Sequence, residues 1–518
     1  MRKPRRYVTG LFFSALVLIF PLPSLAGPWL EAGDPGLRHD LQLLADLGVL
    51  TTPTSIWPIP WGAVAGDLNR VDPTRLPPAH RGAWHRLSTR AQAASVRRWV
   101  KPSLSLAVAG DRPVLRWFNA TPREQGELAV GVEGMKGRFA YRLNGRWLDL
   151  GDPNEELFDL GLDEDDAFPD LRFDGEDVRY DGSYIAFGAG NWAFSVGALD
   201  RYWGPAWGGG LILSNNPRPI PAVALQRIRS APFDVPLLKY LGPWHLTTFI
   251  GQLESDRVVE DALLWGMRIA FRPLRGLEIG LSRTAQWGGT NTRTGEDRPT
   301  DFDTFRRLFA GDDNDGGSPD EPGNQLAGGD IRWSFSIFSQ PMAVYSELIG
   351  EDEAGGVPSR FIGQAGAETW GPLPWDGSSY RVFLEVAETT SEFHKDEARF
   401  NYAYEHGIYR TGYRYRGWSI GYPTDNDSRL ATFGVLGTDS RGRHVNLIIR
   451  SGELNRDDDA RGNTVAPVAA DLFEWQVVVG APLRWGRGSF GFGATRLEPW
   501  QAEVDDAIFG FAQWEISF

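Results

Sequence analysis

A two-residue period in the hydrophobic pattern is the feature that most constrains how this chain can fold. After Lys101, segments of about ten residues alternate between apolar side chains and small or polar ones. Between positions 191 and 200, Trp192, Phe194 and Val196 alternate with such residues. Strands of about ten residues can cross a bilayer when they are tilted. A sheet of such strands would meet lipid on one face and a polar lumen on the other.

The same alternation recurs further along the chain. In residues 277–283, Glu278 and Ser282 oppose leucine and isoleucine side chains, and the pattern returns in residues 263–271 and 474–479. Charged residues are therefore expected on the inner face, where a barrel tolerates them. A soluble propeller could show similar alternation. We favour a membrane barrel because the outward positions are too uniformly apolar for contact with water.

The two ends of the chain resemble targeting signals. Residues 1–26 begin with four basic residues, continue into an apolar run of about ten residues and end on Ser24-Leu25-Ala26, a small-x-small cleavage pattern. They predict a secretory signal peptide that is cleaved near Gly27. At the other end, an alternating strand closes on Phe518, which resembles the signal for assembly of outer-membrane barrels. We expect a Gram-negative outer-membrane protein that is inserted by the barrel assembly machinery and contacts outer-membrane lipid.

After the signal peptide, the sequence contains no apolar stretch long enough for a spanning helix, so a membrane form must be a closed barrel. The chain has no cysteine, which removes thiol catalysis, cysteine-ligated metals and disulfides together. At about 20–25 residues for a strand with its turn and loop, residues 101–518 predict about 18 antiparallel strands. The expected fold is an all-β transmembrane barrel.

Residues 27–100 predict a small helical unit that precedes the barrel. From Asp34 onward, leucines recur at helical spacing, with Asp34 as the N-cap and Gly48 as the stop. A Pro- and Trp-rich segment at residues 57–61 breaks this helix, and residues 78–100 predict a further, basic helix. The sequence therefore divides into a signal peptide, a helical unit and a barrel.

Composition and motifs argue against several functions. Removal of the four basic residues of the signal takes the net charge from −14 to −18, which argues against nucleic acid as a partner. Gly417-Trp418-Ser419-Ile420-Gly421 matches a nucleophile-elbow pattern but lies in a strand-like run, and the seven histidines lack ligand spacing. Acidic runs at residues 312–315 and 351–353 could bind divalent cations, although solvated loops are the favoured interpretation. We expect no enzyme activity, no cofactor and no metal.

Three segments between the predicted strands, residues 200–207, 213–219 and 282–289, are rich in arginine, tryptophan, amides and glycine or proline. Aromatic faces stack on sugar rings, and arginine or amide groups bond to hydroxyls and acidic sugars. The candidate polysaccharide-binding residues are Arg201, Trp203, Trp207, Arg218, Arg283, Gln286 and Trp287. The alternative is that these side chains anchor the barrel at the membrane interface or form ion pairs in the lumen.

Long ordered segments of the sequence resemble the Wzi capsule-assembly family of outer-membrane proteins. The segments that carry the resemblance are residues 33–50 (with LRHDLQLLADLGVL), 57–62, 200–227 (DRYWGPAWGGGLILSNNPRPIPAVALQR), 241–244, 251–257, 263–268, 277–289, 323–333 and 347–359. The resemblance implies a barrel with a helical bundle at its periplasmic mouth. It also implies a non-enzymatic lectin that anchors or organises capsular polysaccharide or a related exopolysaccharide at the cell surface. Residues 120–180 and 455–470 depart from the family pattern.

Two questions stay open at this point. An 18-stranded barrel is wide enough for an aqueous lumen, so a porin-like channel for a small solute is the alternative function. An acidic protein also fits an anionic glycan poorly unless cations bridge them or arginines cluster locally. The arginines considered for such a cluster are Arg201, Arg218, Arg227 and Arg283. The sequence predicts that Trp203→Ala or Arg283→Ala weakens polysaccharide binding while the barrel still assembles.

Overall fold

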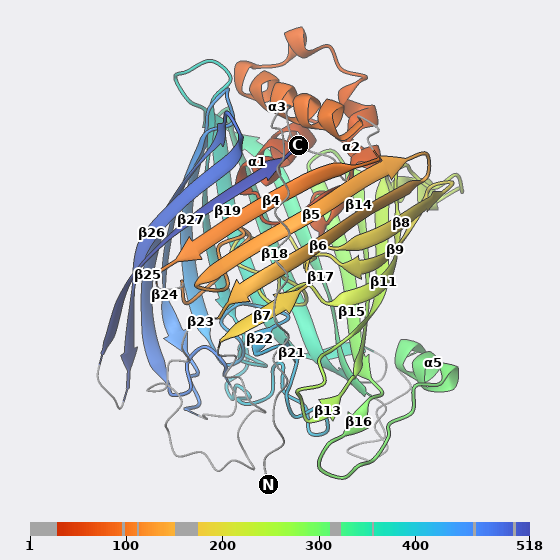
Figure 1. The fold of residues 1–518 in the computed structure, drawn as a ribbon, viewed down its shortest axis with the longest axis vertical. Coiled ribbons are helices and arrows are strands. Elements are labelled where there is room, and N and C mark those ends of the chain that lie inside the picture. Colours follow the sequence, from red (N-terminus) through yellow and green to blue (C-terminus); the bar gives the residue numbers. More distant parts are fainter. Residues whose placement is uncertain are drawn as a thin grey trace, which may run out of the picture.

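The computed structural model is a closed antiparallel β-barrel. It describes residues 28–95, 99–110, 113–150, 175–310, 323–354, 357–458, 463–500 and 504–518. Among these residues the wall has eighteen strands, because β7 and β8 are successive parts of one strand that both pair with β6 (Figure 1). The predicted fold and strand number are confirmed. The predicted signal peptide lies outside the described residues.

The wall strands pair with their neighbours in chain order, and the last strand closes on the first. They are β4 (Lys101–Ala109), β5 (Gly126–Lys136), β6 (Phe139–Asp149), β7 (Glu176–Arg179), β8 (Tyr184–Ala189), β9 (Trp192–Ala198), β11 (Pro221–Arg227), β12 (Trp244–Gln252), β14 (Leu263–Leu274), β15 (Leu277–Trp287), β17 (Gly323–Ile337), β18 (Gln340–Ala354), β19 (Val357–Pro372), β20 (Ser379–Glu388), β23 (Arg429–Thr438), β24 (His444–Leu454), β25 (Ala470–Leu483), β26 (Gly486–Pro499) and β27 (Asp505–Ser517).

The remaining elements are helices and two-residue strands that lie outside this wall pairing. The helices are α1 (Pro35–Asp46), α2 (Trp61–Leu68), η1 (Pro73–Arg75), α3 (Pro78–Ser95), η2 (Leu238–Leu241) and α5 (Phe302–Ala310). The short strands are β1 (Trp29–Leu30), β2 (Ile56–Trp57), β3 (Ile59–Pro60), β10 (Tyr202–Trp203), β13 (Val259–Glu260), β16 (Thr290–Asn291), β21 (Arg414–Tyr415) and β22 (Trp418–Ser419). No helix among the described residues is long and apolar enough to cross a membrane.

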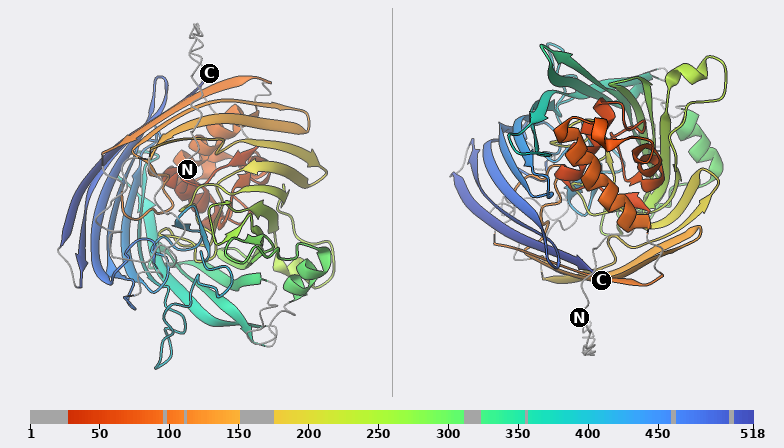
Figure 2. Two further views of the ribbon diagram at one scale, coloured as in Figure 1. Left: turned by 60° about the horizontal axis from the view of Figure 1, so that its bottom comes forward. Right: turned by 90° about the horizontal axis from the view of Figure 1, so that it is seen from above.

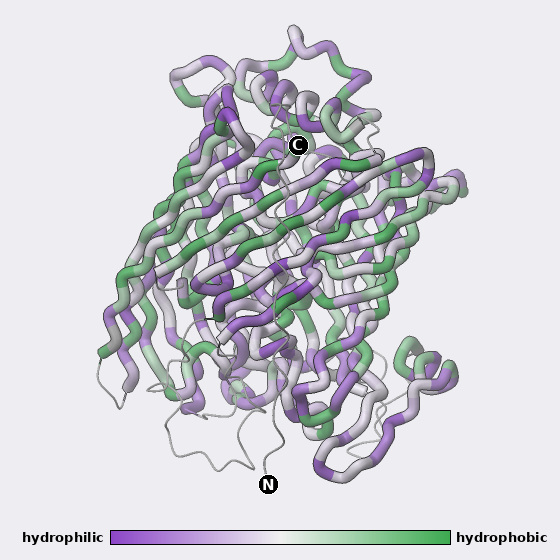
Figure 3. The backbone as a smooth tube through the Cα atoms, in the orientation of Figure 1, coloured by the Kyte–Doolittle hydropathy of each residue, from purple (hydrophilic) through white to green (hydrophobic). Residues whose placement is uncertain are grey.

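The side chains of the wall follow the predicted alternation. In β9, Phe194 and Val196 are exposed on the outer face while Ser195 is buried. In β15, Leu281 is exposed outward, whereas Glu278 faces the lumen and is only 4% exposed. Apolar and polar residues alternate along these strands in Figure 3. The wall therefore presents an apolar outer face to lipid, as a membrane-spanning barrel requires.

The two ends of the barrel differ in their connections. Turns of two residues join β5 to β6, β14 to β15 and β25 to β26 at one end, whereas the opposite end carries the long loops. Helices α2 and α3 and the carboxy terminus lie at the short-turn end, and α5, β13 and β16 lie at the loop end (Figure 1). Short turns face the periplasm in outer-membrane barrels and long loops face outward. The helical bundle therefore lies at the periplasmic mouth.

Helix α1 enters this mouth and is fixed there from both ends. Its predicted N-cap is confirmed, since the Asp34 carboxylate accepts a hydrogen bond from the Leu37 backbone at 2.9 Å. At its other end, Asp46 pairs with Arg332 of β17 at 2.7 Å, and Arg272 of β14 donates to the Ala45 carbonyl at 2.8 Å. Figure 2 shows the amino-terminal helices across the barrel opening. Wall arginines thus replace the partners that the last turn of a helix lacks.

The closing strand behaves as its alternation predicts. Strand β27 pairs with β26 and with β4, so the carboxy-terminal segment joins the two ends of the sheet. Ile508 is 81% exposed on the outer face, and the Phe518 backbone donates to the Pro102 carbonyl at 2.9 Å. The strand that ends in Phe518 therefore leaves the sheet without a free edge.

Candidate functional site

Two loops fold back into the lumen instead of extending from the barrel. Residues 199–220 connect β9 to β11, and nearly all of them are buried. Residues 389–428 connect β20 to β23, and the last eight of these are also buried. Helix α1 enters the lumen from the periplasmic mouth, and the two loops enter it from the loop end. Together these segments fill the lumen, and their side chains pack in the principal core clusters.

Trp207 is the centre of the first inward segment. Its indole nitrogen donates to Glu368 at 3.0 Å, its backbone nitrogen donates to Glu385 at 2.6 Å, and its ring stacks on Phe383 with centroids 5.5 Å apart. The guanidinium of Arg38 in α1 lies 4.3 Å from the same ring. This tryptophan therefore joins the helix, the loop and the wall, and it is fully buried.

The other candidates from residues 200–207 and 213–219 are also buried, and they contact other parts of the chain. Arg201 donates to the Leu199 carbonyl at 3.2 Å and lies over Phe249, against which Trp203 also packs. Arg218 pairs with Glu124 and Asp181, each at 2.6 Å. Arg218 therefore forms ion pairs in the lumen, which is the alternative role considered for these residues. Arg201 and Trp203 stabilise the conformation of residues 199–220.

The third candidate segment is divided between the two faces of the wall. Gln286 faces the lumen, where its side chain accepts a hydrogen bond from Asn324 at 3.0 Å. Arg283 and Trp287 lie on the outer face, in the same phase as Leu281, and both contact α5 or its side chains. Arg227 stacks on Trp244 near the short-turn end. The structure therefore does not bring Arg218, Arg227 and Arg283 into one basic cluster, and glycan contact by the seven candidates stays a prediction.

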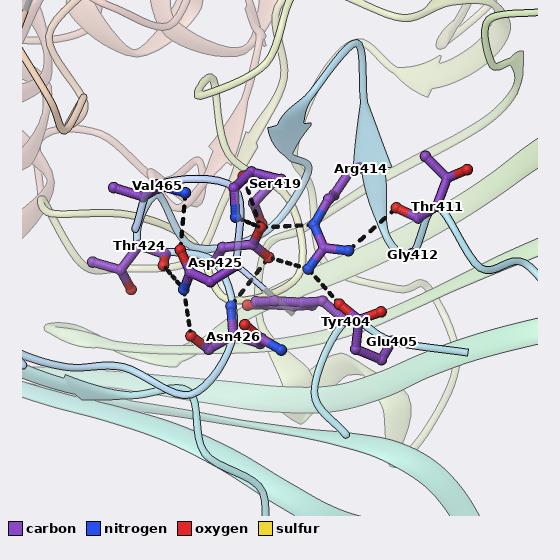
Figure 4. Close-up of polar contacts among 12 residues, drawn as sticks. Tyr404, Glu405, Thr411, Gly412, Arg414, Ser419, Thr424, Asp425, Asn426 and Val465 are labelled. Atoms are coloured by element: carbon purple, nitrogen blue, oxygen red, sulfur yellow. Dashed lines mark hydrogen bonds and ion pairs between the residues drawn. The ribbon is translucent and has the colours of Figure 1, made fainter. Parts of the chain in front are cut away.

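A buried network inside the second inward loop fixes its conformation (Figure 4). The Arg414 guanidinium donates to both oxygens of Asp425, at 2.6 and 3.0 Å, and also to Glu405. Asp425 accepts two further hydrogen bonds from Thr464. The pair is completely buried, and such a bidentate contact holds the two segments in one geometry.

Five residues form an aromatic and basic surface at the loop end of the barrel, which we call the rim surface. It consists of Arg360, Arg399, Phe400, Tyr402 and Arg456. The Arg360 and Arg399 guanidiniums lie 4.5 and 6.0 Å from the Tyr402 ring, and Arg456 lies 5.8 Å from the Phe400 ring. Phe400 is 37% exposed and the Arg399 side chain is 50% exposed. Rings beside guanidiniums suit both stacking on a sugar and bonding to its acidic or hydroxyl groups.

Carboxylates orient the arginines of the rim surface. Arg399 pairs with Glu392 at 2.9 Å, and Arg456 pairs with Glu388, also at 2.9 Å. These pairs restrict the long side chains before any ligand arrives, which lowers the entropic cost of binding. The rim surface was not predicted from the sequence because its residues come from the start of β19, the long β20–β23 loop and the β24–β25 loop. The sequence pattern that could have indicated this surface is the run of basic and aromatic residues at positions 399–402.

A cavity of about 440 Å³ separates the amino-terminal segment from the wall strands β4 to β6 and β25 to β27. Its lining combines arginines with carboxylates: Arg142 pairs with Glu31 at 2.7 Å, and Asp34 pairs with Arg90 at 2.9 Å and with Arg487 at 3.0 Å. The basic and acidic groups balance one another. This lining therefore lacks the excess of one charge that would select an ionic solute.

The structure also shows where some of the remaining sequence motifs lie. Ser419 lies in β22 of a two-stranded hairpin and is 1% exposed, so the nucleophile-elbow pattern is an accidental match. The described residues contain no group of three or more metal-ligating side chains. The interpretation of residues 351–353 as a solvated loop is wrong for Glu351, which lies buried in β18 and accepts a hydrogen bond from the Tyr404 backbone at 2.9 Å. Residues 312–315 lie outside the described residues.

Comparisons with known proteins bear on this arrangement. The family model described as "Capsule assembly protein Wzi" matches residues 97–497. An "uncharacterized 55.8 kDa protein in cps region" of Klebsiella pneumoniae is 29% identical over 361 residues, which are 70% of this chain but only 65% of that relative's length. A solved structure of Escherichia coli Wzi, described as a carbohydrate-binding β-barrel of the outer membrane involved in group 1 capsule assembly, matches with a TM-score of 0.78. It is 24% identical and covers 95% of this chain and 100% of the other, a likeness that confirms the fold.

Proposed function

Since the chain belongs to the Wzi capsule assembly family and is an outer-membrane barrel, we propose that it binds a cell-surface polysaccharide and holds it at the outer face. The rim surface is the proposed contact site. The observation that carries this proposal is the exposed ring of Phe400 beside the half-buried ring of Tyr402, with three guanidiniums around them at the end that faces outward. Capsular polysaccharide or a related exopolysaccharide is the proposed ligand.

The filled lumen supports this function over the porin-like alternative. Trp207, Arg414 and Arg38 each lie inside the barrel and are completely buried or nearly so. A solute would have to displace residues 199–220, which are bonded to the wall and to α1, and residues 389–428, which are bonded to the wall through Glu351. The barrel of eighteen strands therefore serves as a rigid support for the rim surface. This role agrees with membership of a capsule assembly family.

The proposal also assigns partners for assembly. The barrel assembly machinery would recognise the carboxy-terminal strand β27, which carries the apolar outer face and the terminal Phe518. Outer-membrane lipid would cover the exposed apolar residues of the wall, such as Phe194 and Leu281. Neither partner requires an opening in the barrel.

A binding measurement with the purified full-length protein tests the proposed site. Polysaccharide from the surface of the same strain is titrated against wild-type protein and the double variant Phe400→Ala/Tyr402→Ala. We expect affinity to fall by at least about tenfold, which corresponds to about 1.4 kcal/mol. The matched control, Trp375→Ala/Trp485→Ala, removes two exposed rings at the short-turn end and should bind as wild type does. Equal affinity in all three proteins would remove the rim surface from the proposal.

Reconstitution into a planar bilayer tests the alternative function. The filled lumen predicts no large, steady conductance for the wild-type protein. Conductance of the size that an open barrel of this width supports would favour the channel instead.

A further inference from the structure

Helix α5 lies outside the barrel wall, near its loop end (Figures 1 and 2). The Asp301 carboxylate caps it by accepting a hydrogen bond from the Thr304 backbone at 3.0 Å. Phe305 packs against Trp265 of β14 and Trp287 of β15, with centroids 5.6 Å apart in each case. Both tryptophans are almost completely buried by this contact, although their strand positions point away from the lumen. The helix is therefore fixed to the lipid-facing side of the wall.

Arg283 fixes the other end of α5. Its guanidinium donates to the Leu308 carbonyl at 2.8 Å and to the Phe309 carbonyl at 3.3 Å, which lie in the last turn of the helix. Gln325 of β17 accepts a hydrogen bond from the same side chain at 3.1 Å and holds it in place. A cation at a helix C-terminus supplies the missing hydrogen-bond donors and interacts favourably with the dipole. Arg283 lies on the outer face of a wall strand and is hydrogen-bonded there to α5 and β17.

The exposed part of α5 combines aromatic rings with basic groups. Phe302 is 78% exposed. Phe309 is 50% exposed although its ring also packs on Trp265, with centroids 5.6 Å apart, and Leu308 is completely buried against the wall. Arg306 is 60% exposed beside Asp303, and Arg307 follows it in the last turn. Helical geometry places Phe302 and Phe309 beside Phe305, on the side of the helix that adjoins the apolar outer face of the wall. That surface continues the apolar outer face of the wall, for which lipid contact is proposed above.

From these contacts we infer that α5 is an interfacial helix that binds phosphorylated lipid of the outer leaflet. Phe302 and Phe309 enter the acyl boundary, and Arg306 and Arg307 contact the lipid phosphates. An amphipathic helix with rings on one side and arginine at its edge has the composition of a helix that lies in the plane of an anionic membrane surface. Each arginine near such a surface strengthens binding about fivefold. The inference stands apart from the rim surface, since no residue is shared.

Binding of lipid A that carries both phosphates tests the inference on the full-length protein in detergent micelles. Arg306→Gln/Arg307→Gln and, separately, Phe302→Ser/Phe309→Ser should each weaken binding by at least about tenfold. The charge-matched control is Arg441→Gln/Arg443→Gln, which changes two exposed arginines in the β23–β24 turn at the periplasmic end and should bind as wild type does. Lipid A without phosphates should bind weakly to all four proteins, and inorganic phosphate should not compete.

The fold of each variant is checked by the shift in gel mobility on heating and by retention of polysaccharide binding. A folded variant that keeps full affinity for lipid A would overturn the inference. Competition by inorganic phosphate would also overturn it, because it would show an ion site in place of a lipid site. Equal loss in the Arg441 and Arg443 control would show a general charge effect and contradict the assignment to α5. Failure of the wild-type protein to bind polysaccharide, while it still binds lipid A, would count only against the rim surface.

Discussion

A buried carboxylate of Asp427 accepts a hydrogen bond from the backbone nitrogen of Asn401, with 2.6 Å between Oδ2 and N. Asn401 lies between Phe400 and Tyr402, the two rings of the rim surface. The carbonyl oxygen of Asp427 also accepts a hydrogen bond from the Arg456 backbone at 2.9 Å. One completely buried residue therefore holds two of the three chain segments that form this surface.

The position of Asp427 predicts a pH dependence of the rim surface. Burial, with Asp457, Asp425 and Glu388 nearby, raises the pKa of Asp427 to about 7 despite the bond from Asn401, and burial likewise raises the pKa of Glu405 to about 7 despite Arg414. The folded loop therefore retains protons that an unfolded loop releases near pH 4. Its stability should fall as the pH rises from about 4 to about 7 and should level off above that range.

Hydrogen exchange in residues 399–404, corrected for the intrinsic rates, measures this dependence between pH 5 and pH 8. Asp427→Asn keeps an acceptor for the Asn401 nitrogen and should reduce the slope, and Asp427→Asn/Glu405→Gln should remove most of it. An unchanged slope in the double variant would show that other groups control the loop.

Arg414 and Asp425 predict the effect of breaking a buried ion pair. Arg414→Ala leaves the Asp425 carboxylate buried without its cation, which costs about 3–5 kcal/mol. We expect residues 389–428 to become accessible to protease in the folded barrel, and polysaccharide affinity to fall because the rim surface rests on them. Arg414→Leu/Asp425→Leu removes both charges and should restore much of the resistance to cleavage. If Arg414→Ala were cleaved as slowly as the wild type, the network in Figure 4 would not be what fixes the loop.

Trp203 and Trp207 offer a matched comparison inside the lumen. Both rings are completely buried, but only Trp207 donates from its indole nitrogen, to Glu368 at 3.0 Å, while that of Trp203 has no partner among the described residues. Trp207→Phe should therefore cost about 1 kcal/mol more than Trp203→Phe, since the two changes remove similar volumes. Thermal unfolding in detergent, followed by gel mobility, measures the difference. A larger effect of Trp203→Phe would contradict the geometry.

Substitution of Arg283 distinguishes its structural role at the end of α5 from its predicted role in glycan contact. Arg283→Ala removes the donors at the end of α5, so we expect faster exchange of the α5 amides and greater exposure of Trp265 to a lipid-soluble quencher. Polysaccharide affinity should stay within about twofold of the wild type, because Arg283 lies on the lipid-facing side of β15. A loss of tenfold or more, with α5 intact, would return Arg283 to the glycan-contacting residues.

The barrel was predictable because its sequence pattern is local. Side chains alternate strictly along a strand, so Glu278 and Leu281 could be assigned to opposite faces without knowledge of their neighbours. The same phase places Arg283 outside, a consequence that the sequence analysis did not draw. Helix α5 was missed because its stability comes from the wall tryptophans and Arg283 more than from its own nine residues.

The candidate site was harder to predict because it depends on contacts between distant segments. Trp207 and Arg218 have the composition of a sugar site, yet the folded chain supplies their partners from Glu368 and Glu124. The rim surface joins Arg360 of β19 to Tyr402 of the β20–β23 loop, and no periodic pattern relates these two segments. Composition identified the kinds of side chain involved, and only the fold shows which of them remain exposed.

The central claim is that a partly exposed aromatic and basic surface on a closed barrel binds cell-surface polysaccharide. Equilibrium binding of that polysaccharide to wild-type protein, to Phe400→Ala/Tyr402→Ala and to Trp375→Ala/Trp485→Ala tests it most directly. The predicted result is measurable binding by the wild type and the control, with at least about tenfold weaker binding by the rim variant. Equal binding by the three proteins, or no binding by the wild type, would contradict the claim.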